Sequence, residues 1–287
     1  MNASEGRIDW PGFARRTDFD GTEAEPLLMH VCHKYTSGFD ARCGERLFFF
    51  TAERAALHPL AILIPASVID MVAAETKILL SAGCLQFMDT NCQNRCLKES
   101  EPVNVLPFCD HHQGEVVRDN LLILISNLKL FGRRSLVLDL ILGCNTEKNI
   151  LSAAEAIILA ANPDLQLLSA FVGAGEGLTP AFDDFLSGML LADRFASLDQ
   201  ISVPDGFFEL AGSKTTVQAL QQLTFAARGR LSLRFETFIA ALLQRQIKSA
   251  EVVKVLHYGH SSGTDLLCGI WHHLNQAYVG LNKKARC

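Results

Sequence analysis

The sequence predicts an α+β protein, in which a β-rich N-terminal domain is followed by a mainly α-helical bundle domain. Short apolar runs rich in Phe, Ile or Val and bounded by Gly, Asp or Pro occur between residues 27 and 88. Beyond residue 113 the apolar residues recur instead at three- and four-residue spacing, which is typical of helices. We therefore expect the β-rich domain over residues 1–110 and the helical domain over residues 111–287.

The composition is typical of a soluble globular chain with a substantial core, because 49% of its 287 residues are hydrophobic and 20% are charged. A net charge of -5, with no basic run interleaved with aromatics, argues against nucleic-acid binding. The acidic start, with Glu5 and Asp9, predicts no signal peptide, and no apolar run is long enough to span a membrane. Nine scattered cysteines argue against a disulfide framework, so we expect a cytoplasmic protein.

In the N-terminal part, four apolar runs predict strands and one longer segment predicts a helix. The strands are expected at Leu27–Tyr35, Arg46–Thr51, Leu60–Pro65 and Gly83–Met88. The segment Val68–Leu80 has apolar residues at helical spacing.

In the C-terminal part, caps and stop signals delimit the expected helices. Three helices are expected to end before a stop signal: Val117–Leu130 before Gly132, Leu151–Ala161 before Asn162-Pro163, and Lys214–Arg228 before Gly229. Two are expected to begin after an N-cap serine: Leu233–Gln246 after Ser232, and Ala250–Tyr258 after Ser249. A further helix is expected after the glycine-rich loop that begins at Gly173, and the last one over Asp265–Tyr278. Short polar connections favour antiparallel neighbours, hence a bundle.

One group of thiols and imidazoles deserves comparison with a zinc site. Its members are Cys84, Cys92, Cys96, Cys109, His111 and His112. Structural zinc sites usually contain two close cysteine pairs, whereas here only Cys92 and Cys96 lie close together. We therefore expect free cysteines and no metal in this segment.

The stretch from Gly173 to Gly188, G-A-G-E-G-L-T-P-A-F-D-D-F-L-S-G, is called the first motif below. Its three alternating glycines predict a tight loop whose backbone N–H groups converge on a ligand. The loop delivers Asp183 and Asp184 to the start of an apolar helix, where negative charge is favoured. A helix cap and a simple turn would explain one carboxylate, but neither the second nor the glycines.

The stretch from Gly259 to Gly269, G-H-S-S-G-T-D-L-L-C-G, is called the second motif and resembles the first. In both, a Gly-containing loop leads to an aspartate at the start of an apolar helix, and a glycine follows four residues later. We expect Asp184 and Asp265 to lie close together and the two loops to line one pocket. Gly188 and Gly269 would let the two helices pack closely.

A third segment, Lys214-Thr215-Thr216, lies at a predicted helix start and suits a phosphate or carboxylate. The chemistry of these groups predicts His260 as an acid–base residue, with Asp184 and Asp265 orienting it or holding a cation. The residues expected to bind substrate are Gly173, Gly175, Gly177, Thr179, Asp183, Lys214, Thr215, Thr216, Ser261 and Ser262.

Four functions are compatible with this pattern. The loops could bind a phosphate- or carboxylate-bearing metabolite in an enzyme or an enzyme subunit. Alternatively, Asp183, Asp184 and Asp265 could hold Mg²⁺ for a hydrolase, or the chain could be a non-catalytic assembly or regulatory subunit. A Ser/His/Asp hydrolase built from Ser261, His260 and Asp265 is disfavoured, because adjacent residues such as Ser261 and His260 rarely form a nucleophile–base pair.

The two motifs, with Lys214-Thr215-Thr216 and Ala226–Gly229 between them, resemble a bacterial family that includes a subunit of oxamate carbamoyltransferase. The resemblance covers residues 150–275 well and the β-rich part only in outline. One departure is Ala181-Phe182, which stands where the family pattern would have a small Ser-Gly pair. Phe182 is expected to narrow the loop.

The resemblance implies a carbamoyltransferase subunit of anaerobic allantoin (purine) catabolism. Its reaction would be carbamoyl transfer between a 2-oxo acid amide and phosphate, and its partners a small anionic metabolite and other subunits. No cofactor is implied, although Mg²⁺ stays open.

Overall fold

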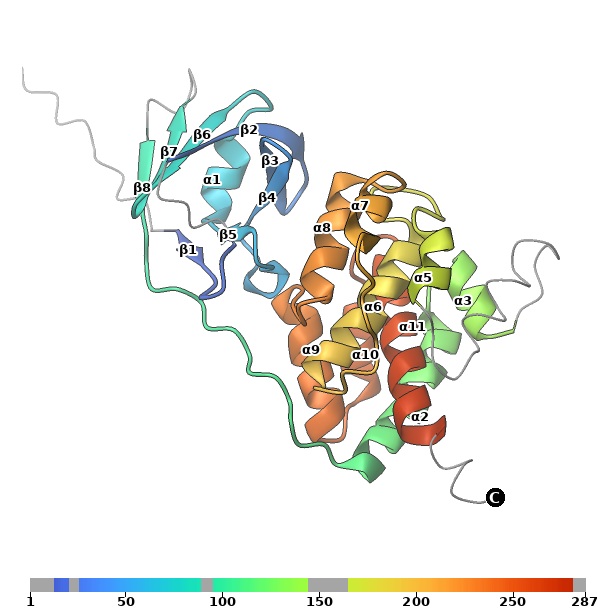
Figure 1. The fold of residues 1–287 in the computed structure, drawn as a ribbon. Helices are drawn as coiled ribbons and strands as arrows, with labels where there is room; N and C mark the ends of the chain where they lie inside the picture. The colour runs from blue at the N-terminus through green and yellow to red at the C-terminus, as the bar shows by residue number, and fades with distance from the viewer. Residues whose placement is uncertain (1–12, 21–25, 89–94, 144–164, 281–287) are drawn as a thin grey trace, which may run out of the picture. The chain divides into compact units, whose positions relative to one another are not determined.

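The structure is a computed structural model that describes residues 13–20, 26–88, 95–143 and 165–280. The chain divides into two compact units, which we call unit 1 (Met1–Val105) and unit 2 (Leu106–Cys287). Unit 1 contains the sheet and unit 2 contains all of the longer helices described (Figure 1). The predicted α+β class, with a β-rich part before a mainly helical part, is therefore confirmed.

Unit 1 is built around one curled sheet of eight strands. Its elements are β1 (Ala14–Arg15), β2 (Leu27–Lys34), β3 (Gly38–Cys43), β4 (Arg46–Thr51), β5 (Ala61–Leu63), α1 (Ala66–Met71), β6 (Lys77–Ser81), β7 (Cys84–Met88) and β8 (Arg95–Lys98). The strand order is β1-β5-β4-β3-β2-β6-β7-β8, and only the β4–β5 pair is parallel among these strands.

The alternation of side chains along β2 explains why it forms a strand. Leu27, Met29 and Val31 are buried, whereas Leu28 and His30 between them are exposed. Successive strand residues point to opposite faces, so this pattern gives the sheet one apolar face.

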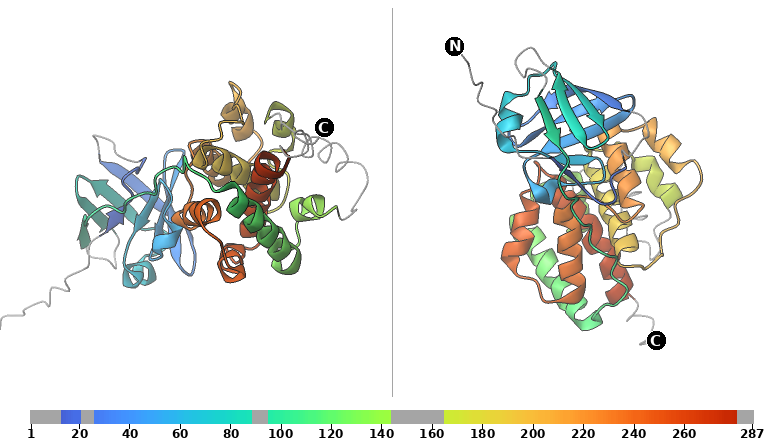
Figure 2. Two further views of the ribbon diagram at one scale, coloured as in Figure 1. Left: turned by 90° about the horizontal axis from the view of Figure 1, so that it is seen from below. Right: turned by 90° about the vertical axis from the view of Figure 1, so that its left-hand side faces the viewer.

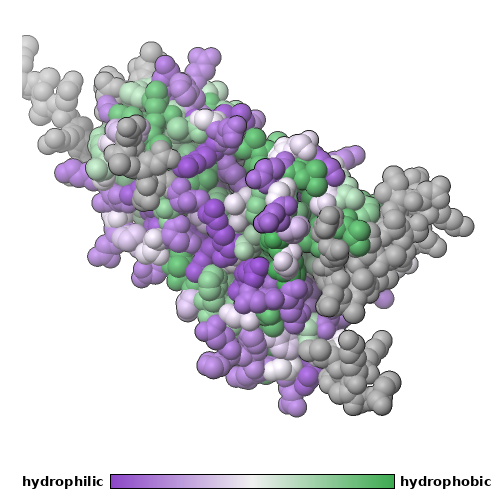
Figure 3. Space-filling model, in the orientation of Figure 1, coloured by the Kyte–Doolittle hydropathy of each residue, from purple (hydrophilic) through white to green (hydrophobic). Residues whose placement is uncertain are grey.

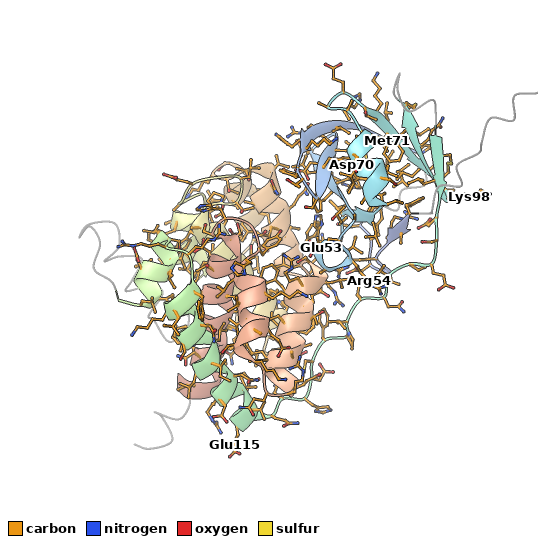
Figure 4. All side chains as sticks on the ribbon, turned by 180° about the vertical axis from the view of Figure 1, so that it is seen from behind. Glu53, Arg54, Asp70, Met71, Lys98 and Glu115 are labelled. Carbon is orange, nitrogen blue, oxygen red and sulfur yellow. A yellow bond between two sulfur atoms is a disulfide. The ribbon has the colours of Figure 1, made fainter. Side chains whose placement is uncertain are left out.

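The sequence prediction of one helix over Val68–Leu80 is wrong. Helix α1 ends at Met71, whose side chain lies at the surface of unit 1 (Figure 4), and Lys77–Ser81 forms β6. In the sheet, Ile78 pairs with Met29 on one side and with Phe87 on the other. A short apolar run fits either period, and pairing with two neighbouring strands decides in favour of the strand.

The cysteines also differ from the expectation. Cys84 and Cys96 are joined by a disulfide between the paired strands β7 and β8, with their Cα atoms 6.3 Å apart. The other described cysteines, Cys32, Cys43, Cys109 and Cys268, are free, and Cys92 lies outside the described residues.

Unit 2 is a helical bundle (Figure 2). Its helices are α2 (Gly114–Phe131), α3 (Leu136–Ile141), α5 (Leu165–Leu168), α6 (Ala181–Phe195), α7 (Phe207–Gly212), α8 (Val217–Ala226), α9 (Leu233–Gln244), α10 (Ser249–Leu256) and α11 (Ser262–Asn275). The helix expected over Leu151–Ala161 lies outside the described residues.

Helix α6 forms the centre of unit 2, since every residue in it except Arg194 is buried. It packs along α11 and is also contacted by α3, α8 and α9.

Hydrophilic and apolar residues are interspersed over the face of the molecule shown in Figure 3. In the described part of the chain, every helix is too short or too polar to cross a membrane.

Several helix starts differ from the predictions, including that of α2, which begins at Gly114 rather than Val117. Helix α11 begins at Ser262, so Asp265 lies inside its first turn rather than opening it. Helix α10 begins at Ser249 with Lys248 as its N-cap. Helix α8 begins only at Val217, because Thr216 is its N-cap and its side chain accepts a hydrogen bond from Ala219 N.

Candidate functional site

The loop of the first motif depends on its glycines. Gly173, Gly175 and Gly177 all have positive φ, at 83°, 127° and 93°. A Cβ atom on Gly173 would overlap the carbonyl oxygen of Lys214, and one on Gly175 would overlap the backbone N of Ala181. Only glycine satisfies both the backbone angles and this close approach.

The glycines that end the two motifs let α6 and α11 touch through their backbones. A Cβ atom on Gly188 would overlap the carbonyl oxygen of Leu266, and one on Gly269 would overlap that of Phe185. Leu266 and Phe185 each follow the aspartate of their own motif. The two motifs therefore pack reciprocally, each glycine facing the other motif.

This packing gives Asp184 and Asp265 equivalent places. Each is the fourth residue of its helix and is fully buried. Asp184 Oδ1 accepts a hydrogen bond from Gln222 Nε2 at 2.6 Å, and Asp265 Oδ1 accepts one from Ser135 Oγ. The second oxygen, Oδ2, of each aspartate is buried and has no hydrogen-bond partner in the described part of the chain.

The two motifs also meet through side chains. Thr179 Oγ1 and Ser262 Oγ form a hydrogen bond of 3.0 Å, in which either hydroxyl can be the donor. Both residues are only partly buried, and both hydroxyls act on the carboxyl group of Asp184. The hydroxyl pair thus joins the loop of the first motif to the first turn of α11.

Burial dominates the proton affinity of Asp184 and raises its pKa to about 8. The Gln222 amide and the Ser262 hydroxyl oppose this rise, whereas the negative charge of Asp265 adds to it. Asp184 therefore mainly keeps its proton at pH 7.

Burial also raises the pKa of Asp265, but only to about 6, because the hydroxyls of Ser135 and Ser261 stabilise the ionised form. At pH 7 Asp265 is mainly ionised. The pair thus combines one carboxylic acid with one carboxylate, the division of roles that acid–base sites use.

Asp183 holds the loop in place. Its Oδ1 accepts a hydrogen bond from Gly173 N at 2.8 Å, and its Oδ2 accepts one from Thr215 Oγ1. Burial raises the pKa of Asp183, and these two donors oppose the rise. Both of its oxygens are therefore engaged within the protein.

The segment Lys214-Thr215-Thr216 lies against the first motif. Thr216 Oγ1 donates to the carbonyl oxygen of Leu178, and the exposed Lys214 donates from Nζ to that of Ser169 at 3.1 Å. The segment thus anchors the loop, and a role for it in anion binding stays a prediction.

His260 and Ser261 precede α11. His260 is exposed in the turn, and none of the hydrogen bonds of the described residues joins it to Asp184 or Asp265. Ser261 is the N-cap residue of α11 and accepts a backbone hydrogen bond from Asp265 N. The acid–base role of His260 stays a prediction.

Phe182 lies in an aromatic cluster beside the loop, and its narrowing of the loop stays a prediction. Its side chain is buried, and its ring lies 5.1 Å from that of Phe171 and 5.6 Å from that of Phe185. The ring packs into an aromatic cluster, since apolar surface is stabilised by burial.

Two residues of the site were missed by the sequence analysis. Gln222 lies within α8, and Ser135 is the N-cap of α3, where it also accepts a hydrogen bond from Leu138 N. Ser135 before an apolar run is a recognisable cap signal, but nothing in the sequence connects either residue with an aspartate.

No group of three or more His, Cys, Asp or Glu side chains is placed to hold a metal among the described residues. In the segment that was compared with a zinc site, Cys109 Sγ donates a hydrogen bond to the carbonyl oxygen of His111. The ring atom Nε2 of His112 is hydrogen-bonded to the carbonyl oxygen of Cys109.

Unit 2 is thus a helical domain in which two loop–helix motifs converge on a pair of buried aspartates. The model of the family described as oxamate carbamoyltransferase subunit AllH matches residues 171–274, which include both motifs. The family resemblance predicted from these motifs is therefore confirmed over this part of the chain. No solved structure matches the chain.

Proposed function

We propose that this chain is a subunit of a carbamoyltransferase and that its two motifs together bind a small anionic substrate carrying a carbamoyl or phosphate group. The match over residues 171–274 supports the class, because it includes both motifs. The observation that carries the binding site is the Thr179–Ser262 contact next to Asp184 and Asp265, each of which has one unpartnered carboxylate oxygen.

The electrostatics of the pair are compatible with an anion. Because Asp184 is mainly neutral at pH 7, the pair carries one negative charge rather than two. The hydroxyls of Thr179 and Ser262 and the N–H groups of the loop supply donors. Carbamoyl transfer needs mainly positioning and charge stabilisation, which such donors provide.

A subunit role fits the groups present. The described residues around the pair include acids, amides and hydroxyls but no activated nucleophile. We infer that partner subunits contribute the remaining groups and that the pathway is that of oxamate. The Mg²⁺-dependent alternative is not favoured, because both oxygens of Asp183 accept hydrogen bonds within the protein.

The test is thermal denaturation of the full chain with carbamoyl phosphate, oxamate or phosphate. Each ligand that binds the folded state raises the Tm. Asp184→Ala and Asp265→Ala should each reduce this rise, and the double variant by less than the sum, because both act on one ligand. Asp70→Ala, at an exposed position of unit 1, is the control.

Three results would contradict the proposal. If none of the ligands raises the Tm at millimolar concentration, the chain is an assembly subunit without this site. If the losses of the two folded variants simply add, the motifs do not share a ligand. Rapid turnover by the isolated chain would instead indicate a self-sufficient enzyme.

A further inference from the structure

The unpartnered oxygens of Asp184 and Asp265 are the starting point. Buried polar atoms are nearly always hydrogen-bonded, so two buried carboxylate oxygens without a partner in the described residues need an explanation. A third such atom, Ser187 Oγ, follows Asp184 by three residues and so lies on the same side of α6. Three buried, unpartnered oxygens indicate a place where a small polar group binds.

We propose that Asp184 and Asp265 bind the planar –CO–NH2 end of the substrate. Oδ2 of Asp184 donates its proton in a hydrogen bond to the carbonyl oxygen, and Oδ2 of Asp265 accepts one from the amide nitrogen. This inference rests on the proposed function, since it assigns the carbamoyl end of that substrate to these two residues.

The donors and acceptors of the two partners are complementary. A protonated carboxyl group offers one O–H donor, whereas an ionised one offers only acceptors. A primary amide has one carbonyl acceptor and an NH2 donor side by side. Phosphate and carboxylate groups offer mainly acceptors, so they would leave Asp265 unpaired and be repelled by it.

This complementarity also orients the substrate. The negative charge of Asp265 keeps the anionic end of the substrate away from the pair, and the loop of the first motif lies on the exposed side. The N–H groups of Gly175 and Gly177 are then available to the anionic end. The two ends of one small molecule are thereby recognised by different groups.

The protonation states required are those expected near neutral pH. Burial raises the pKa of Asp184 to about 8 and that of Asp265 to about 6. Among the described residues, the Cys268 thiol also interacts electrostatically with Asp265. Burial raises the pKa of that thiol far above neutrality, so Cys268 stays uncharged. The donor–acceptor pair therefore exists between about pH 6 and pH 8.

The sharpest probes are oxamate and pyruvate, which have the same charge and nearly the same shape. They differ in that pyruvate has a methyl group where oxamate has NH2. Titration calorimetry with the full chain at pH 7 should show that oxamate binds about tenfold more tightly or better, about 1.4 kcal/mol. The preference should fall off below pH 6 and above pH 8.

Two matched substitutions separate the roles. Asp184→Asn keeps a donor in place of the carboxyl proton, so this variant should retain the preference for oxamate. Because the amide does not titrate, the variant should also keep that preference above pH 8. Asp265→Asn replaces the acceptor oxygen by an NH2 group, so it should abolish the preference. Asp70→Asn, exposed on unit 1, should leave both affinities unchanged.

The outcomes distinguish this inference from the proposed function. If neither compound nor phosphate binds, the proposed function fails. If they bind without a preference for oxamate, or if both asparagine variants prefer oxamate as the parent does, only the inference fails, and a buried water satisfies the oxygens. The pH profile of the unaltered protein tests the inference even if a variant does not fold.

Discussion

The two motifs of unit 2 pack in the same way, but their aspartates lie in different environments. Both place an aspartate at the fourth position of a helix and a glycine four residues later. Yet Asp184 is hydrogen-bonded by an amide from α8, and Asp265 by a hydroxyl that caps α3. The glycines fix the geometry, whereas the surrounding helices decide which aspartate keeps its proton.

The residues before the two aspartates show the same contrast. Asp183 accepts hydrogen bonds from Gly173 N and from Thr215. The residue at the equivalent position of the second motif is Thr264, whose Oγ1 accepts a single hydrogen bond from Arg133 N at 3.0 Å. Both residues anchor a neighbouring connection, but the longer loop of the first motif is held by more bonds.

The largest expected effect is the loss of stability when the close contact between α6 and α11 at Gly188 and Gly269 is disturbed. Gly188→Ala and Gly269→Ala should each destabilise the protein by about 3 kcal/mol or more, because the new methyl group overlaps a carbonyl oxygen of the facing helix. Denaturation with urea measures the loss. Gly114→Ala, at the open start of α2, should have little effect. Equal stabilities of the three variants would show that α6 and α11 are not in close contact.

The next largest effect compares how much Asp183 and Thr264, which anchor neighbouring connections, contribute to stability. Asp183→Ala should cost about 2–3 kcal/mol, because it leaves Gly173 N without its buried acceptor. Thr264→Val should cost about 1 kcal/mol, since it removes one hydrogen bond to a neutral group. Urea denaturation of both variants gives the comparison. A larger loss for Thr264→Val would reverse the order of the two anchors.

Much of the fold follows from local patterns. The run Arg46–Thr51 and the α2 stop at Gly132 correspond to strand and helix boundaries in the structure, because the signals lie in the elements themselves. The strand β6 was missed, since its identity depends on β2 and β7 on either side. Pairing between distant segments is not encoded in the spacing of one short run.

The site divides in the same way. The equivalence of Asp184 and Asp265 is visible as a repeat in the sequence, because each motif specifies its own helix start. Gln222 and Ser135 were not foreseen, because they come from other helices and act only through tertiary contacts. The proton affinities depend on those contacts and on burial, so they too required the structure.

The pH dependence of stability sharpens the contrast between the two aspartates. An unfolded aspartate loses its proton near pH 3.8, whereas folded Asp184 keeps its proton up to about pH 8. The folded state binds more protons in this range, so the contribution of Asp184 to stability is fully present below about pH 3.8 and is lost as the pH rises towards 8. Asp265 contributes a similar fall that ends near pH 6.

Asp184→Asn removes the first of these contributions. Between pH 6 and pH 8 the Tm of the unaltered protein should fall more steeply than that of Asp184→Asn, whereas Asp265→Asn should keep most of the fall, because burial raises the pKa of Asp184 more than the charge of Asp265 does. Calorimetric scans across this range provide the measurement. Parallel curves for the parent and Asp184→Asn would show that Asp184 is already ionised at pH 6.

The smallest expected effect concerns the direct contact between the motifs. Thr179→Val and Ser262→Ala each remove one hydroxyl of a partly exposed, neutral hydrogen bond, so each should cost about 0.5–1.5 kcal/mol. Because the second substitution has no bond left to break, the double variant should lose less than the sum, with a coupling of about 0.5–1 kcal/mol. Strict additivity would mean that the hydroxyls of Thr179 and Ser262 do not interact with each other. The hydrogen bond between these two hydroxyls would then be absent in solution, and a ligand would reach Asp184 without having to break it.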